Sequence, residues 1–128
     1  MEPAEYKDLK EKYDSYIQNA PDGIFVVNSK GKFLEVNNAA CNLTGYSSDE
    51  LLRMNIMDLI PREGFKKALR HFAKARRNSR TSRELSCKRK DSSLCYLLME
   101  GVKVGTDRYI GYCKDITKSK ELKDELIR

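Results

Sequence analysis

The residues that could carry chemistry in this chain are its cysteines and its one histidine. The cysteines are Cys41, Cys87, Cys95 and Cys113, and none of them forms a Cys-x-x-Cys pair or a zinc spacing with His71. No nucleophile–base arrangement and no phosphate-binding glycine loop is recognisable in the sequence. We therefore expect reduced, buried thiols, no metal site and no catalytic activity in this chain.

Positive charge is the second chemical feature. The net charge is +6, and eleven basic residues lie between Lys66 and Lys90 against one acid, Glu84. Such a stretch favours a solvated helix face, with an acidic partner surface or nucleic acid as alternatives. No zinc finger, helix-turn-helix or aromatic–basic RNA signature accompanies it, so we expect no nucleic-acid partner. A salt-dependent shift of a generic duplex would contradict this expectation.

The first element expected is an amphipathic helix over residues 1–19. Its apolar stripe consists of Tyr6, Leu9, Tyr13 and Tyr16, at spacings of three and four residues. A stripe this narrow either docks on a sheet or forms a seam with a second helix.

The remaining chain alternates between strand and helix signals and divides into a core, 20–116, and a terminal helix, 117–128. Gly31 suits a hairpin turn, Ser47 and Glu50 form a capping box, Pro61 suits the first turn of a longer helix, and Thr117 can cap the last one. Strands are expected at 24–27, 32–37, 81–90, 93–104 and 108–116. This order predicts an α+β fold with one antiparallel sheet and its helices gathered on one side.

Side-chain periodicity predicts which faces are buried. In the longer helix, Phe65, Leu69, Phe72 and Ala73 share one face, which places His71 toward solvent or at the rim. The strand expected at 93–104 is apolar on both faces, because Leu94, Tyr96 and Leu98 alternate with apolar residues that face inward. The second face therefore needs a cover, from the first helix, a partner subunit or both, and we expect a homodimer.

Several strings in this order resemble the PAS sensor family, including its PAC segment: Ala20–Asn28, Gly31–Ala40, Leu43–Leu52 and Tyr109–Thr117. Together they cover about residues 20–120. The resemblance implies a five-stranded antiparallel sheet in the order 2-1-5-4-3, with helices over one face that enclose a small cavity and further helices at both ends.

The resemblance also implies a function: a cytoplasmic, non-catalytic sensory and dimerisation module of a signal-transduction protein. By analogy the parent is a sensor histidine kinase of a two-component system, with a transcription regulator as the alternative. Asp115, Ile116 and Thr117 join a buried strand directly to the last helix, so a strand shift must move that helix. The first twenty residues are charged and no apolar run is long enough to span a bilayer, so we expect no membrane contact.

The resemblance raises two cofactor questions. Flavin photoreceptors of the light-oxygen-voltage branch carry a reactive cysteine where this chain has Met54–Asp58, and amide side chains where it has Cys87, Leu97 (or Cys95) and Cys113, so flavin is not expected. Haem-binding members use a histidine from the long helix, which makes a haem sensor using His71 the alternative.

The remaining candidate site is a small apolar pocket, although the same residues describe an ordinary filled core, which we favour. We expect weak or no small-molecule binding. The candidate lining residues are Phe25, Val27, Leu43, Ile56, Leu69, Phe72, Leu85, Cys87, Leu97, Met99 and Cys113.

Overall fold

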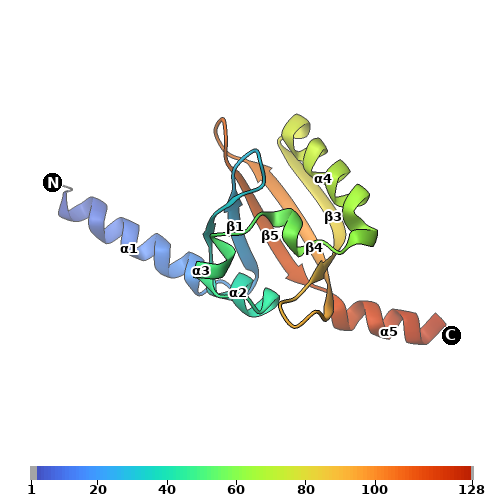
Figure 1. Ribbon diagram of the computed structural model, residues 1–128. Helices are drawn as coiled ribbons and strands as arrows, with labels where there is room; N and C mark the ends of the chain where they lie inside the picture. The colour runs from blue at the N-terminus through green and yellow to red at the C-terminus, as the bar shows by residue number, and fades with distance from the viewer. Residues whose placement is uncertain (1–2, 128) are drawn as a thin grey trace.

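The computed structural model describes residues 3–127. Helices and strands follow in the predicted order, and the core lies between two helices that project from it (Figure 1). The elements are α1 (Ala4–Gln18), β1 (Gly23–Val27), β2 (Phe33–Val36), α2 (Asn38–Thr44), α3 (Ser48–Leu51), η1 (Ile56–Leu59), η2 (Arg62–Gly64), α4 (Phe65–Asn78), β3 (Arg80–Lys88), β4 (Leu94–Lys103), β5 (Tyr109–Asp115) and α5 (Thr117–Ile127).

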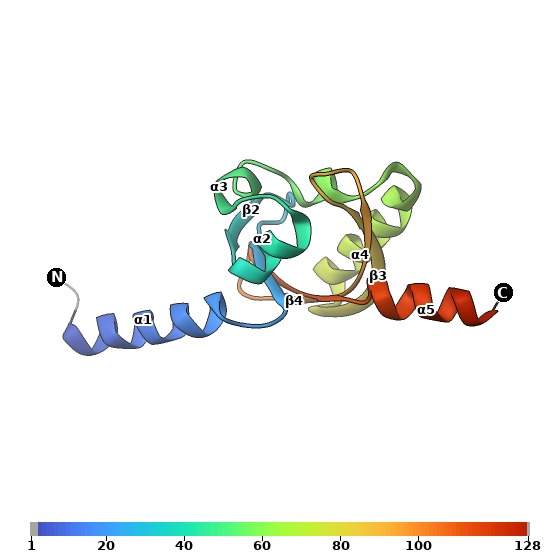
Figure 2. The ribbon, with the colours of Figure 1, turned by 90° about the horizontal axis from the view of Figure 1, so that it is seen from below.

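The strands form one antiparallel five-stranded sheet in the order β2-β1-β5-β4-β3, which confirms the predicted fold. The first and last strands of the chain are therefore neighbours, with Gly23 opposite Cys113. Figure 2 shows α2, α3 and α4 on one side of this sheet.

Local signals in the sequence account for the turns and short helices. Gly31 has a φ of 86°, which a glycine adopts without strain, in the turn between β1 and β2. Asn37 caps α2 by accepting a hydrogen bond from the Ala40 N–H. The capping box of Ser47 and Glu50 is present at α3 as predicted. Pro61 differs: it precedes η2, and α4 begins only at Phe65.

The inward faces of the strands form the core. Phe25, Leu85, Leu97 and Met99 are buried, and so are Cys87, Cys95 and Cys113. The alternation predicted for the strand at 93–104 is thereby confirmed. Phe33, Leu51, Ile56 and Leu59 close the core from the helical side.

The predicted buried face of α4 was wrong. Ala68, His71 and Ala75 are buried, Phe72 is half-buried, and Phe65 and Leu69 are 41% and 48% exposed. The helix turns its small residues toward the sheet because they permit close approach: a Cβ built on Gly101 of β4 would lie 4.0 Å from the Ala75 Cβ. His71, predicted to face solvent, is only 4% exposed.

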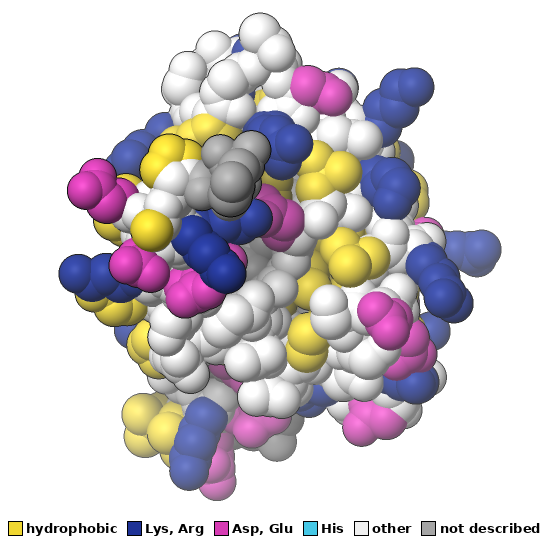
Figure 3. Space-filling view, turned by 90° about the vertical axis from the view of Figure 1, so that its left-hand side faces the viewer, with side chains coloured by type: hydrophobic (Ala, Val, Ile, Leu, Met, Phe, Trp, Pro, Cys, Tyr) yellow, Lys and Arg dark blue, Asp and Glu magenta, His cyan; other side chains and the backbone are white. Residues whose placement is uncertain are grey.

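α1 does not cover the outer face of the sheet, and α5 reaches it only through Lys120, whose Nζ lies 5.4 Å from the centroid of the Tyr96 ring. α1 and α5 project from opposite sides of the core, and no residue of either helix is buried (Figures 1 and 2). Figure 3, which views the side where α1 projects, shows hydrophobic side chains exposed among charged ones. Docking of α1 on the sheet, one of the two predicted arrangements, therefore does not occur within residues 3–127.

Candidate functional site

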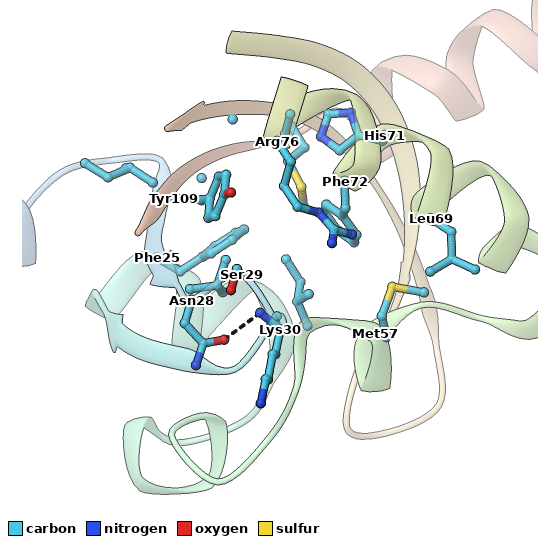
Figure 4. A pocket seen from close by; sticks show the side chains of 18 residues that line it. Phe25, Asn28, Ser29, Lys30, Met57, Leu69, His71, Phe72, Arg76 and Tyr109 are labelled. Carbon is cyan, nitrogen blue, oxygen red and sulfur yellow. Dashed lines mark hydrogen bonds between the residues drawn. The ribbon is translucent and has the colours of Figure 1, made fainter. Parts of the chain in front are cut away.

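A cavity of about 130 Å³ lies between α4 and the inner face of the sheet. It exists because two glycines, Gly101 of β4 and Gly111 of β5, lie opposite each other on that face and contribute no side chains. Phe25, Met99 and Ile56 form apolar walls, and Phe72 belongs to α4 above them. Figure 4 shows these side chains around the open space.

A second, smaller cavity of about 30 Å³ lies beneath α2, α3 and η1 and is lined by apolar side chains of the core together with Thr44 and Ser86. Phe25, Ile56 and Met99 line both cavities. The ring of Phe25 packs against Gly111, since a Cβ added there would lie 2.3 Å from the ring carbon Cζ. It also packs edge-on against Phe33, with ring centroids 5.5 Å apart. Phe25, together with Ile56 and Met99, thus lies between the two spaces.

Every residue predicted to line a pocket borders one of these cavities, and their role in binding remains a prediction. Bordering the larger cavity are Val27, Leu69 and Phe72, with Phe25, Ile56 and Met99 shared. Bordering the smaller one are Leu43, Leu85, Cys87, Leu97 and Cys113.

The polar rim of the larger cavity was missed by the sequence analysis. It includes Asn28, Ser29 and Lys30 in the turn after β1, Tyr109 of β5 and Arg76 of α4. In Figure 4 the Arg76 side chain reaches from α4 toward the space between Tyr109 and Phe72, whereas the amino end of Lys30 points away. The only sequence signal was that residues 28–31 form a turn beside a buried strand.

His71 lines the same cavity and is held by β3. Its Nε2 lies 3.3 Å from the Thr81 hydroxyl. Burial lowers the pKa of His71, and the nearby cations Arg83 and Lys74 lower it further, so the ring is neutral. A haem ligand needs a free ring nitrogen and space for a macrocycle. Nε2 is engaged with Thr81, and the cavity is well below the ~300 Å³ at which pockets for drug-sized ligands begin, so these residues do not fit haem.

The inner-face thiols do not fit flavin photochemistry. Cys87 and Cys95 are directly opposed across β3 and β4. A hydrogen bond with Cys95, followed by burial, raises the pKa of Cys87, and burial raises the pKa of Cys113. Cys87 and Cys113 are therefore neutral thiols, and none of the three cysteines offers an amide. Met54–Asp58, where the reactive cysteine would lie, contains none.

The predicted relay residues form a hydrogen-bonded junction between the sheet and α5. The Ile116 N–H donates to the Tyr96 carbonyl at 2.9 Å, and the Tyr96 N–H donates to the Thr117 hydroxyl at 2.9 Å. Asp115 accepts the Thr117 N–H at 2.9 Å and lies 3.7 Å from the Arg89 guanidinium. Thr117 therefore binds α5 to β4, and Asp115, rather than Thr117, caps the helix.

The residues predicted for a dimer seam lie on two surfaces. Tyr6, Leu9, Tyr13 and Tyr16 are all at least half exposed along α1. Leu94, Tyr96 and Leu98 lie on the outer face of β4, with Leu94 exposed and the other two half-buried. The sequence analysis missed further apolar residues on this outer face, although strand alternation could have identified them: Ile24, Val26, Ile110 and Tyr112.

The basic residues of α4 form a solvated stripe. Lys66, Lys67, Arg70, Lys74 and Arg77 are all exposed, as predicted, and the helix has no acidic residue. The ion pairs of the basic stretch are formed elsewhere: Lys90 with Glu50 at 2.8 Å, Glu84 with Lys120 at 3.4 Å, and Arg89 with Asp115.

A five-stranded antiparallel sheet in this order, with helices on one face around a small cavity, defines an α+β domain of the sensory class. The sequence matches the family model described as PAS fold over residues 11–116. The chain therefore belongs to the PAS family, whose domains are generally non-catalytic sensory modules. The comparison with curated proteins found no match.

Solved structures share this fold at identities below 25%. A domain of a sensory box sensor histidine kinase/response regulator from Geobacter sulfurreducens has a TM-score of 0.74 and 21% identity, with 86% of this chain and 96% of that chain covered. A PAS domain from a two-component sensor histidine kinase has a TM-score of 0.75 and 22% identity, covering 85% and 98%. An RNA-binding light-oxygen-voltage receptor has a TM-score of 0.83 and 22% identity, covering 97% and 37%.

Within residues 3–127, none of the helices is long and apolar enough to cross a membrane. In the same part of the chain, no group of three or more histidine, cysteine, aspartate or glutamate side chains is arranged to hold a metal ion.

Proposed function

We propose that this chain is a sensory and dimerisation module of a larger signalling protein, with a sensor histidine kinase as its parent. Membership of the PAS family supports the sensory role. Two structures of similar fold come from sensor histidine kinases, which supports that parent. A transcription regulator is the alternative parent that the same module would serve.

The observation that carries the proposal is the junction at Tyr96, Asp115 and Thr117. Two hydrogen bonds of 2.9 Å join the start of α5 to Tyr96 of β4, and a third of 2.9 Å joins the Thr117 N–H to Asp115 at the end of β5. Residues 121–127 of α5 are exposed. Met99, on the same strand as Tyr96, lines both cavities. A change in cavity occupancy that shifts β4 would therefore displace α5, which leads out of the domain.

The test is Asp115→Ala in the intact parent protein. This change removes the acceptor for the Thr117 N–H and the partner of Arg89, so we expect the parent's autophosphorylation rate to change several-fold. Asp124→Ala, an exposed change later in α5, is the matched control and should leave the rate unaltered. An unchanged rate in Asp115→Ala would overturn the relay, and a parent without autophosphorylation would overturn the kinase assignment.

Dimerisation is supported by the two exposed apolar surfaces. Tyr13 and Tyr16 are each 57% exposed on α1, and their rings pack edge-on against each other at 6.3 Å. On the outer sheet face, Ile24 lies opposite Tyr112 and Val26 opposite Ile110. A second copy that packed its α1 against this face would remove both surfaces from water, and a second copy that packed α1 against α1 would remove the α1 stripe.

A further inference from the structure

We propose that the cavity beneath α4 binds a small monocarboxylate with a compact apolar body, and that Arg76 binds its carboxylate. This inference rests on the proposed sensory function and names the chemical class of the signal. The apolar walls determine the size and polarity of the ligand's body, and the charge at the rim determines which headgroup is bound.

The size of the cavity limits the body. A volume of about 130 Å³ is close to that of an engineered protein cavity of ~150 Å³ that binds benzene. Phe25, Ile56, Phe72 and Met99 present apolar surface, and Gly111 presents only backbone. Such a space accommodates a single ring or a short branched chain, and its apolar walls favour such a body over water.

The charge around the cavity selects the headgroup. Arg76 is exposed at the rim, directed toward the space, and has no salt bridge within the described part of the chain. The lining of the cavity contains no aspartate or glutamate, and the Asp107 carboxylate, next to the lining residue Ser29, accepts the Ser29 N–H at 2.9 Å. His71 is neutral, so the site offers one directed positive charge. Guanidinium and carboxylate groups form paired, charge-assisted hydrogen bonds.

Phe25 sets the upper size limit. Its ring stands on Gly111 between the larger cavity and the smaller one of about 30 Å³. Shortening this side chain would join the two spaces, so a larger aromatic acid would enter only when the ring is removed.

The experiment is calorimetric and NMR titration of the 128-residue chain with benzoate, and with benzamide as the neutral isostere. We expect benzoate to bind with a Kd on the order of 1 mM, the range available to a ligand of this size. Benzamide should bind at least about ten-fold more weakly, because it cannot form the charge-assisted pair. The amides of Gly101 and Gly111 should shift during the benzoate titration.

Two variants separate a specific contact from general charge. Arg76→Gln should weaken benzoate binding by about ten-fold or more. Arg77→Gln, an exposed neighbour on the solvated stripe, loses the same charge without touching the cavity and should bind as the wild type does. Both positions are exposed, so both variants should fold, and circular dichroism verifies this. Equal binding of benzoate and benzamide, equal effects of both variants, or no binding of benzoate would each overturn the assignment.

Phe25→Leu provides an independent readout of size. The variant should bind 2-naphthoate more tightly than the wild type does, and exclusion of 2-naphthoate from both would overturn the role of Phe25. None of these outcomes affects the Asp115→Ala measurement, so failure of the ligand class is distinguishable from failure of the proposed function.

Discussion

At the scale of single residues, two glycines, which have no side chain, leave the space of the candidate site. Gly101 and Gly111 are paired across β4 and β5, and the ring of Phe25 occupies the space over Gly111. The cavity beside that ring is a consequence of two glycines in strands, where glycine otherwise weakens a sheet.

Gly111→Ala should destabilise the protein and constrict the cavity. The new Cβ would lie 2.3 Å from Phe25 Cζ, so the ring must move, and overpacking of this kind costs about 1–3 kcal/mol. Gly101→Ala is the matched control, because its Cβ would meet Thr81 Oγ1 at 3.2 Å and Ala75 at 4.0 Å. Urea unfolding measures both variants. A smaller loss of stability for Gly111→Ala than for Gly101→Ala would contradict this packing.

His71 should make stability depend on pH. Its pKa is lowered from 6.5 in the folded protein by burial and by Arg83 and Lys74, so the unfolded chain binds the additional proton. Stability is therefore lost as the pH falls below about 6.5 and levels off below the folded pKa. His71→Gln should show a smaller fall in the free energy of unfolding between about pH 7 and about pH 5. Parallel pH profiles for the two proteins would exclude this role.

At the scale of elements, the strands were predictable and the orientation of α4 was not. Two-residue alternation and turn signals such as Gly31 define strands and their inward faces from local pattern alone. In α4 the large residues Phe65 and Leu69 pointed to the wrong buried face. The alternative face of Ala68, His71 and Ala75 has the same spacing, and only the close approach to Gly101 selects it.

Local sequence pattern also predicted only part of the candidate site. Its apolar walls follow from strand alternation, so residues such as Phe25 and Met99 were identified. Arg76 was not, because it is one of several cations on α4 and nothing in the sequence indicates which of them is directed at a cavity.

Thr117→Val should loosen α5 from the sheet. It leaves the partly buried Tyr96 N–H without an acceptor, which costs about 1–2 kcal/mol. Hydrogen exchange at the Tyr96 amide should accelerate. Thr117→Ser retains the hydroxyl and should behave as the wild type does, and so should Ser119→Ala in the exposed part of α5. Unchanged exchange in Thr117→Val would show that the hydroxyl does not anchor the helix.

At the scale of the whole molecule, apolar side chains of the α1 stripe are exposed, and those on the outer face of the sheet are exposed or half-buried. The dimer that we propose would bury them without a change in the core. In such a dimer, the α1 stripe would place the helix that leads into the domain at the interface.

Sedimentation at tens of micromolar protein should show a dimer that Tyr13→Glu dissociates. The charge would lie in the centre of the apolar stripe, where burial without a partner is costly. Ser15→Glu adds the same charge on the opposite side of α1 and should leave the dimer intact. A wild-type monomer at this concentration would exclude the seam.

The neighbouring positions of β1 and β5 have a mechanical consequence. Gly23, at the start of β1, pairs with Cys113, near the end of β5, so α1 and α5 depart from the same end of one strand pair and point in opposite directions (Figure 1). Force that drew the two helices apart would load the hydrogen bonds of this pair one after another, because they run across the strands. The two strands would separate one hydrogen bond at a time, at a lower force than shearing the same strands would need.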